Sequence, residues 1–216
     1  PFDAVKDFAP ILLVASIANL LVVHPSIPAH SVKELIAFAK TRPNQLVYGS
    51  AGSGTASHFA GELLNMMGGI KVTHIPYKGL APAHTEVIGG QLSMMFDGIV
   101  TGLPAVKAGR LRALAVTTLK RWQGAPAIPT MSEAGLAGFE VNSWFGVLAP
   151  AGTPREIVLR LNSEVARALH EPDARERLYS IGAEPMSNTP EEFAAYINAE
   201  MVKWSKVIKA AGIRVD

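Results

Sequence analysis

The sequence predicts an α/β protein with a mainly parallel sheet, and three observations lead to this class. Between residues 32 and 117, short β-rich segments alternate with helical patterns, as in chains whose parallel strands are joined by helical crossovers. Serine or threonine followed three residues later by glutamate marks helix starts, and glycine after a helical pattern marks helix ends. With 216 residues, the chain is long enough to fold as one large domain or two smaller ones.

The composition excludes several classes of function. The 20 basic and 18 acidic residues give a net charge of +2, and no basic run with interleaved aromatics is present, so nucleic acid is not an expected partner. No apolar stretch reaches the roughly 20 residues of a membrane-spanning helix. The chain has no cysteine and its six histidines show no metal-ligand spacing, so neither a metal nor another cofactor is expected.

The first element is the long β-rich segment Phe8–Val23, which is broken by Ala18-Asn19 and followed by His24-Pro25. An ordinary strand has about five or six residues. We therefore expect one strand that leaves one sheet and enters another, crossing between two lobes. The further strands expected along the chain are Leu46–Tyr48, Lys71–Pro76, Leu92–Phe96, Arg112–Thr117 and Glu140–Leu148.

Capping boxes mark the expected helix starts, because each box satisfies two backbone N–H groups. The four boxes are Ser31 with Glu34, Thr130 with Glu133, Thr153 with Glu156, and Thr189 with Glu192, and Pro154 and Pro190 are expected at the first helical position. Helices are expected to end at Gly68, Gly89, Gly109, Gly182 and Gly212. A boundary is expected near Thr117, after which a Pro-rich segment leads into mostly helical sequence.

Two C-terminal helices show apolar stripes typical of a face that packs on a core. The stripe of the helix over residues 154–170 consists of Ile157, Leu161, Val165 and Leu169. The stripe of the helix over residues 190–211 consists of Phe193, Ile197, Met201, Trp204 and Ile208. Packing is the expected role of the tryptophans, since aromatic side chains dominate cores.

The segment Gly49–His58 is the most informative candidate site, because three glycines turn the chain from a strand into a helix. A helix N-terminus presents free N–H groups and a positive dipole end, so it binds an anion without a cationic side chain. The hydroxyls of Ser50, Ser53, Thr55 and Ser57 add donors. The alternative is an ordinary connection with Ser53 or Thr55 as N-cap, but this many glycines and hydroxyls exceed what capping needs.

Sharper motifs do not fit this segment. A phosphate-binding P-loop requires lysine where Thr55 stands, followed by serine or threonine where Ala56 stands. A dinucleotide fingerprint beginning at Gly52 and Gly54 requires glycine or alanine where Ser57 stands. The segment therefore predicts a neutral anion site and no nucleotide site.

A serine hydrolase or acyltransferase is an alternative function, with Ser50 or Ser53 as nucleophile and His58 as base. Neither serine lies in a G-x-S-x-G elbow. The one acid a turn beyond His58 is Glu62, which is a common surface pairing on helices. No catalytic residue is therefore expected.

Asp97 is a second candidate, because it follows the apolar strand Leu92–Phe96. Open α/β sheets place ligands at the carboxyl ends of their strands. Asp97 is expected either to hold a ligand amine or hydroxyl or to cap the next segment. Tyr77-Lys78-Gly79 also follows a strand and is expected to line the same cleft or to form a solvated turn.

The chain resembles a known family over essentially all of its length. The resemblance rests on YGSAGSGTASHFAGELL, THIPYKGLAPAHTEVIGGQLSMMFDG, GRLRALAVTT, IPTMSEAGLAGFEVNSWFGVLAPAGTP and EEFAAYINAEMVKWSKVIKAAGI, in this order and spacing. These segments are similar to the extracytoplasmic solute-binding receptors of tripartite tricarboxylate transporters, the Bug family.

The resemblance implies a type II periplasmic-binding-protein fold, in which two α/β lobes close over a small carboxylate that a membrane transporter then receives. Family ligands include di- and tricarboxylates, acidic amino acids and nicotinamide-type compounds. The ligand-binding positions implied here are Ser50, Gly52, Ser53, Gly54, Thr55, Ala56, Ser57 and Asp97. A periplasmic monomer is expected. A third function class with this fold is the effector-sensing domain of a transcriptional regulator, and the absence of a helix-turn-helix pattern disfavours it.

Relatives have a further portion of the first lobe before the residues present here, including a second carboxylate-binding loop. We expect residues 1–21 to be part of the first lobe, residues 22–118 to be the second lobe, and residues 119–216 to be the C-terminal portion of the first lobe. The native protein is then expected to exceed the 22.9 kDa of this sequence.

Overall fold

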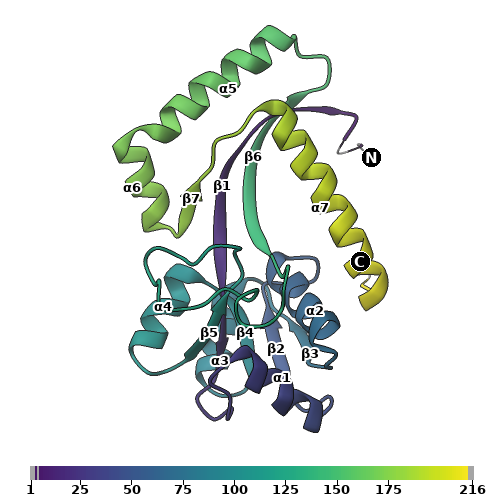
Figure 1. The fold of residues 1–216 in the computed structure, drawn as a ribbon, viewed down its shortest axis with the longest axis vertical. Coiled ribbons are helices and arrows are strands. Elements are labelled where there is room, and N and C mark those ends of the chain that lie inside the picture. The colour runs from purple at the N-terminus through teal and green to yellow at the C-terminus, as the bar shows by residue number, and fades with distance from the viewer. Residues whose placement is uncertain (1–2, 4, 214–216) are drawn as a thin grey trace. The chain divides into compact units, whose positions relative to one another are not determined.

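The computed structural model describes residue 3 and residues 5–213 (Figure 1). The chain divides into two compact units. Unit 1 comprises residues 1–17 and Ser143–Trp204, and unit 2 comprises Ala18–Asn142 and the residues from Ser205 onward. The lobe boundaries expected after residues 21 and 118 stay a prediction.

Unit 2 is an α/β unit of alternating strands and helices. In chain order its elements are α1 (Val32–Thr41), β2 (Val47–Ser50), α2 (Ala56–Gly68), β3 (Thr73–Pro76), α3 (Leu80–Ile88), β4 (Met94–Gly98), α4 (Ile99–Lys107) and β5 (Arg112–Val116). The strand β1 (Phe8–Val23) begins in unit 1 and ends in unit 2.

The sheet of unit 2 has the order β3-β2-β4-β1-β5. Strand β2 pairs in parallel with β3 and β4, whereas β1 is antiparallel to both β4 and β5. Four strands therefore run in one direction and β1 runs against them. The predicted mixed, mainly parallel sheet is confirmed.

Strand β1 also confirms the predicted crossing between sheets. Its residues Asn19–Val23 pair with β4 in unit 2, whereas Ala15–Ile17 pair with β7 (Ala183–Pro185) in unit 1. The strand β6 (Asn142–Pro150) pairs with β1 as well. All residues of this segment are buried or half-buried, so it packs along its whole length.

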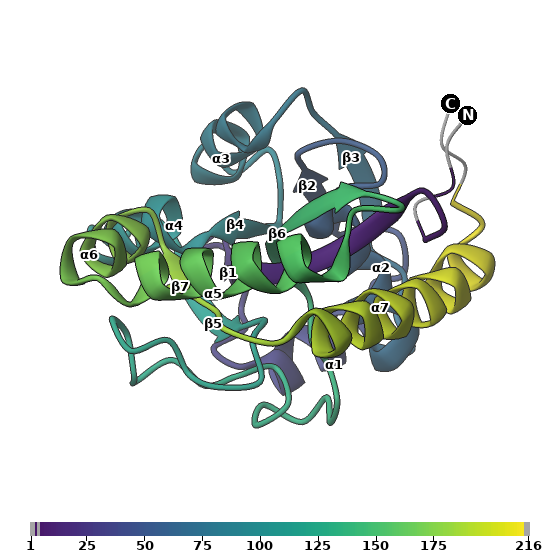
Figure 2. The ribbon, with the colours of Figure 1, turned by 90° about the horizontal axis from the view of Figure 1, so that it is seen from above.

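The helices of unit 2 cover both faces of its sheet (Figure 2). Gly61 of α2 lies against the ring of Tyr48, where a Cβ atom would come within 2.2 Å of the ring. On the opposite face Gly49 lies against Ala83 of α3, at 3.0 Å from such a Cβ. The alternation of side chains along a strand thus assigns α2 and α3 to different faces.

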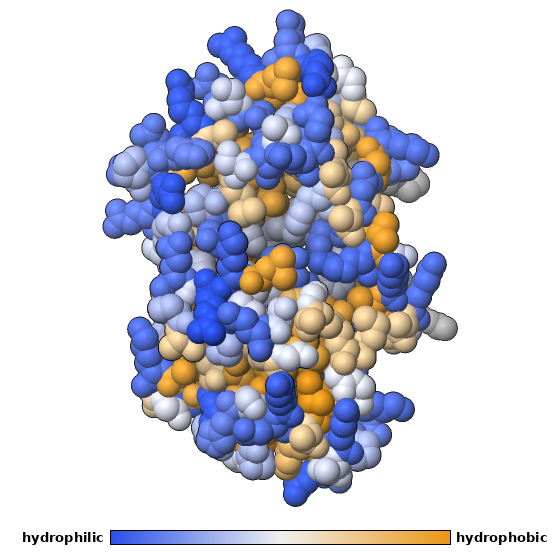
Figure 3. Space-filling view, in the orientation of Figure 1, coloured by the Kyte–Doolittle hydropathy of each residue, from blue (hydrophilic) through white to orange (hydrophobic). Residues whose placement is uncertain are grey.

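Unit 1 contains α5 (Arg155–His170), α6 (Pro172–Ser180) and most of α7 (Pro190–Ala211). Its core includes Ile11, Leu12, Ala149, Val158 and Leu169. No helix among residues 5–213 is long and apolar enough to cross a membrane. On the face shown in Figure 3, hydrophilic residues cover most of the surface.

The predicted capping boxes have three different outcomes. The Thr189–Glu192 box forms reciprocally at the start of α7, with N–H to oxygen distances of 2.8 and 3.2 Å. Ser31 caps α1 by accepting from the Glu34 N–H at 3.2 Å. The Thr153 box is wrong, since that hydroxyl donates to the Pro150 carbonyl and α5 begins at Arg155, after Pro154 as N-cap.

The Thr130–Glu133 box forms both of its bonds, at 2.9 and 3.0 Å, but no helix follows it. Gly135 and Gly138 have φ values of 110° and 79°, which leave the helical region and end the turn. The predicted helix start at Thr130 is therefore wrong, although the local hydrogen bonding is as expected.

Two predicted helix ends are displaced by one residue. Gly109, Gly182 and Gly212 have the positive φ expected after a helix, at 70°, 76° and 64°. After α2 and α3, however, Gly69 and Gly90 have the positive φ, and Gly68 and Gly89 do not. Two consecutive glycines stand at the end of each of these helices, and the rule that a glycine ends a helix does not distinguish the first glycine from the second.

The predicted apolar stripes are partly wrong. On α5 the buried residues are Val158 and Leu169, while Ile157 and Leu161 are 45% and 40% exposed. On α7, Phe193, Glu200 and Val207 are buried, and Met201 is exposed. The buried residues of α7 recur every seven positions, so a narrower face packs than the apolar pattern indicates.

We expect Gly61→Ala to destabilise the protein by about 1–3 kcal/mol, because the added Cβ would overlap the buried Tyr48 ring. Urea unfolding followed by circular dichroism measures this loss. Gly68→Ala on the same helix is the matched control, since its Cβ would meet Ile36 at a milder 3.3 Å. Equal stability of the two variants would contradict the close packing of α2 on β2.

Candidate functional site

Three chain segments leave the same edge of the unit 2 sheet. The parallel pairing puts Ser50 of β2 beside Pro76 of β3, and Gly49 beside Met95 of β4. The segments after β2 and β3 are joined directly, because the Gly79 N–H donates to the Ala51 carbonyl at 3.0 Å. This edge is where open α/β sheets bind ligands.

The hydroxyls of the segment after β2 mostly hold that segment in shape. The Ser57 hydroxyl accepts from the Ala51 N–H at 3.0 Å, and the Ser50 hydroxyl accepts from the Gly52 N–H at 3.1 Å. The Thr55 hydroxyl donates to the Gly52 carbonyl at 2.7 Å. Three of the four hydroxyls predicted as ligand donors therefore have partners inside the loop.

Ser53 is the exception, because it is exposed and its hydroxyl has no hydrogen bond within residues 5–213. Gly52 and Gly54 on either side have φ values of 133° and 79°. Only glycine adopts such values without strain. The two glycines thus turn the chain so that Ser53 projects from the loop.

Four backbone N–H groups of the loop have no acceptor among the described residues: those of Ser53, Ala56, Ser57 and His58. Thr55 stands at the N-cap of α2, with φ −81° and ψ 163°, but its side chain accepts no backbone hydrogen bond. The cap therefore leaves the first-turn amides free. The helix dipole adds a positive potential of about half an elementary charge at the same place.

Two stacked histidines lie directly beneath the loop. The rings of His58 and His74 are 3.9 Å apart with an interplanar angle of 10°, and Tyr48 stacks on His74 at 4.9 Å. Nε2 of His74 is hydrogen-bonded to the Ser50 hydroxyl at 2.6 Å. Nδ1 of His58 accepts from the Gly54 N–H at 3.0 Å, so both rings hold the loop.

Both histidines are neutral at physiological pH. Burial lowers the pKa of His58 below 6.5. Burial, and secondarily the repulsion that a protonated His58 would exert, lowers the pKa of His74 to about 4. The loop is thus supported by uncharged rings, and its positive potential comes from the backbone amides at the start of α2.

The catalytic pair that the hydrolase alternative requires, Ser53 with His58, is not assembled. Nδ1 of His58 is occupied by Gly54, and Glu62 accepts from the Tyr48 hydroxyl at 2.7 Å. Ser50 does contact a histidine, His74, but its side chain is fully buried. Its hydroxyl therefore has no access to a substrate.

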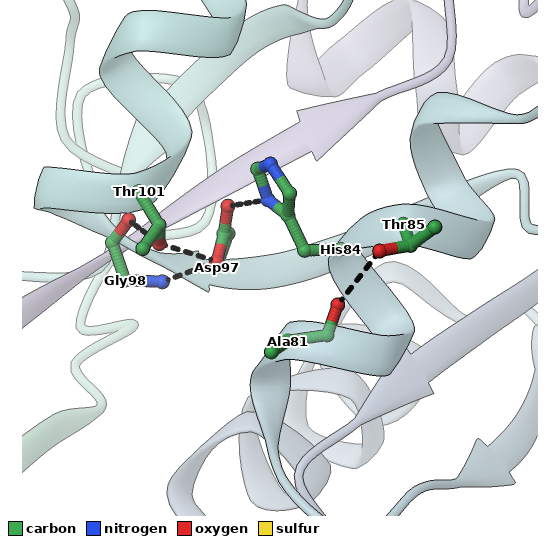
Figure 4. A network of polar contacts seen from close by, with 6 residues as sticks. All are labelled: Ala81, His84, Thr85, Asp97, Gly98 and Thr101. Atoms are coloured by element: carbon green, nitrogen blue, oxygen red, sulfur yellow. Dashed lines mark hydrogen bonds and ion pairs between the residues drawn. The ribbon is translucent and has the colours of Figure 1, made fainter.

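Asp97 is fully buried at the end of β4 (Figure 4). One carboxylate oxygen accepts from the Gly98 N–H and the Thr101 hydroxyl, both at 2.8 Å. The other lies 2.6 Å from Nδ1 of His84 on α3. Asp97 does not cap α4, because the N-cap is Gly98 and no side chain caps it. His84 is an additional partner of Asp97 that the sequence did not indicate.

Asn19 is a further polar residue that sequence reasoning did not select. It pairs in register with Gly98, directly beside the end of β4. Its side chain is only 4% exposed, and its Nδ2 has no hydrogen-bond partner. A buried donor without a partner costs free energy of folding. Asn19 therefore adds one unused hydrogen-bond donor beside the end of β4.

No metal site is found in the part of the chain that the structure describes, since no three histidine, cysteine or acidic side chains converge there.

We expect the protein to lose stability as the pH falls from about 6.5 toward 4. In this range His58 and His74 bind protons in the unfolded chain but stay neutral in the folded protein, because folding lowers both pKa values. Between pH 7.5 and pH 5, His74 accounts for about 1–2 kcal/mol of this loss. Urea unfolding at the two pH values measures it.

His74→Gln removes the titrating ring, so the variant is expected to lose less stability in acid than the native chain does. His30→Gln, at an exposed position before α1, is the control. The same acid sensitivity in His74→Gln as in the native chain would rule out this origin.

Comparison with known proteins identifies the family. The family profile described as "Tripartite tricarboxylate transporter family receptor" matches residues 1–213. A protein from Pseudomonas sp. strain P51, described as a UPF0065 protein in the tcbD-tcbE intergenic region, is 38% identical over 209 residues. The alignment covers 96% of this chain and 62% of that protein, so the chain spans less than two thirds of this relative's length.

Two solved structures share the fold. The first, described as R. palustris Rpa4515 with adipate, is 42% identical with a TM-score of 0.83, covering 98% of this chain and 71% of the other. The second, MatC from Rhodopseudomonas palustris with bound malate, is 33% identical with a TM-score of 0.79, covering 96% of this chain and 71% of the other.

These matches agree with the parallel strands and glycine-rich loop described above. The fold is the type II periplasmic-binding-protein fold, of which the chain represents a part. The chain belongs to the tripartite tricarboxylate transporter receptor family, whose members include the Bug proteins.

Proposed function

We propose that the protein is a periplasmic receptor that binds a small carboxylate and delivers it to a tripartite tricarboxylate-type membrane transporter. The observation that carries this proposal is the set of unpaired N–H groups at Ser53 and at the start of α2. The structures of relatives described with adipate and with malate support a carboxylate as the ligand.

The chemistry of the loop favours a carboxylate over a phosphate. Amide N–H groups form charge-assisted hydrogen bonds to an anion, and four of them match the lone pairs of one carboxylate. The loop from Gly49 to His58 contains no lysine or arginine, and its two supporting histidines are neutral. A site of this kind suits an anion of single charge.

We assign different roles to the residues of the loop. Ser50, Thr55 and Ser57 fix its shape through their hydroxyls, and Gly52 and Gly54 provide its left-handed turns. Ser53, through its hydroxyl and amide, and Ala56, through its amide, contact the ligand. The Ser57 amide also faces the ligand. Asp97 contributes from the end of β4.

We expect dicarboxylates to raise the melting temperature of the protein, because a ligand that binds the folded state stabilises it by mass action. At a ligand concentration 100 times Kd, the gain is roughly 2.7 kcal/mol. Thermal shift against mono-, di- and tricarboxylates measures this gain. A panel that leaves the melting temperature unchanged would argue against the proposed function.

Ala56→Pro tests the amides directly. Proline lacks the N–H group but suits the first position of a helix, and Thr55 before it already has the extended conformation that proline requires. We therefore expect unchanged stability and a loss of about 1.5–3 kcal/mol in carboxylate binding, as for a hydrogen bond to a charged group.

Ala56→Gly is the matched control, since it changes the side chain but keeps the N–H group. Ser53→Ala is expected to weaken binding by about 0.5–1.5 kcal/mol. Isothermal titration calorimetry compares the three variants. Equal affinity of Ala56→Pro and Ala56→Gly would show that this amide does not bind the ligand, and hydrolysis of ester substrates abolished by Ser53→Ala would favour the enzyme alternative.

A further inference from the structure

His84 and Asp97 form a buried pair that the anion-binding loop does not use. Asp97 lies at the end of β4 and His84 lies on α3, and Nδ1 of His84 is 2.6 Å from the Asp97 carboxylate (Figure 4). The side chain of Asp97 is fully buried, whereas that of His84 is 22% exposed. The histidine is therefore the member of the pair that a ligand can reach.

The carboxylate of Asp97 has no open side toward a ligand. It accepts from Gly98, Thr101 and His84. The backbone of α4 also covers it, because a Cβ atom at Gly102 would lie 3.2 Å from its second oxygen. Asp97 consequently cannot receive a ligand amine without losing one of these bonds.

The ring of His84 is oriented by this carboxylate. Its Nδ1 faces Asp97, and its Nε2 points away from the carboxylate (Figure 4). Nε2 has no hydrogen-bond partner within residues 5–213. When the ring is protonated, it forms an ion pair with Asp97 and presents an N–H group on the far side.

The position of His84 relates it to the loop after β2. Its neighbour Ala83 packs on Gly49, the residue before that loop. His84 itself reaches the end of β4, which pairs in parallel with β2. Paired strands lie about 4.8 Å apart, so His84 and the loop flank the same edge from neighbouring strands.

We propose that His84, oriented by Asp97, binds the second carboxylate of a diacid whose first carboxylate occupies the loop, and thereby makes the receptor selective for diacids over monoacids. This inference rests on the proposed function. Asp97 is then a positioning residue, which acts through His84 without touching the ligand.

The test compares diacids with monoacids of equal chain length. Titration calorimetry measures binding of succinate and butyrate, glutarate and valerate, and adipate and hexanoate to the native chain and to His84→Leu. We expect His84→Leu to weaken diacid binding about tenfold or more, as for one hydrogen bond between charged groups. Monoacid binding is expected to change by less than about twofold, since the loop is intact.

Two further variants separate ligand contact from a structural role. His84→Gln retains a side-chain N–H donor and is expected to recover part of the diacid preference. Thr85→Ala, at an exposed position of the same helix, is the matched control and is expected to bind like the native chain. Asp97→Asn removes the charge that orients the ring and is expected to lower affinity for diacids only.

The possible outcomes distinguish the two proposals. If the native chain binds none of the acids, the proposed function is overturned and this inference with it. If the native chain binds diacids and His84→Leu weakens diacids and monoacids equally, or neither, the role of His84 is overturned and the receptor function stands.

Discussion

The parallel pairing of β2 with β3 and β4 is the constraint on which the candidate site depends. Because these strands run in one direction, the segments that follow them emerge at a single edge, and the Gly79 N–H can bond to the Ala51 carbonyl. Tyr48 extends this constraint to α2, since its ring packs against Gly61 and stacks on His74. The start of α2 is thereby held at the end of β2, and its free amides face the edge.

The start of α2 differs from an ordinary helix start in the hydrogen-bond partner of its N-cap side chain. In α1 the N-cap residue Ser31 accepts from a backbone N–H and satisfies it. In α2 the N-cap residue Thr55 instead donates its hydroxyl to the Gly52 carbonyl. The bond tightens the loop and leaves the amides of the first turn without an acceptor. Stability of the loop and availability of the amides therefore come from the same interaction.

The sequence predicted local features better than it predicted tertiary ones. Short-range patterns in the sequence predicted the alternation of strands and helices, the crossing at Ala18-Asn19 and the glycine-rich loop at Gly49–His58. The structure confirms the predicted strands. The failures arise where packing decides: a capping box at Thr130 forms without a helix, and Ile157 on α5 is exposed although it lies in an apolar stripe.

The pair of His84 and Asp97 shows why such sites escape sequence reasoning. The two residues are 13 positions apart and belong to different elements, so no periodicity relates them. Their contact arises because α3 packs over the ends of β2 and β4, which is a property of the sheet order. Asp97 alone looked like a ligand group, since it follows a strand. A fully buried carboxylate requires partners that compensate its charge. Because His84 is one of these partners, the polar side chain that is exposed at this place is that of His84 and not that of Asp97. Asp97 at the end of β4 thus orients the imidazole ring of His84, and the proposed selectivity for diacids depends on this histidine of α3.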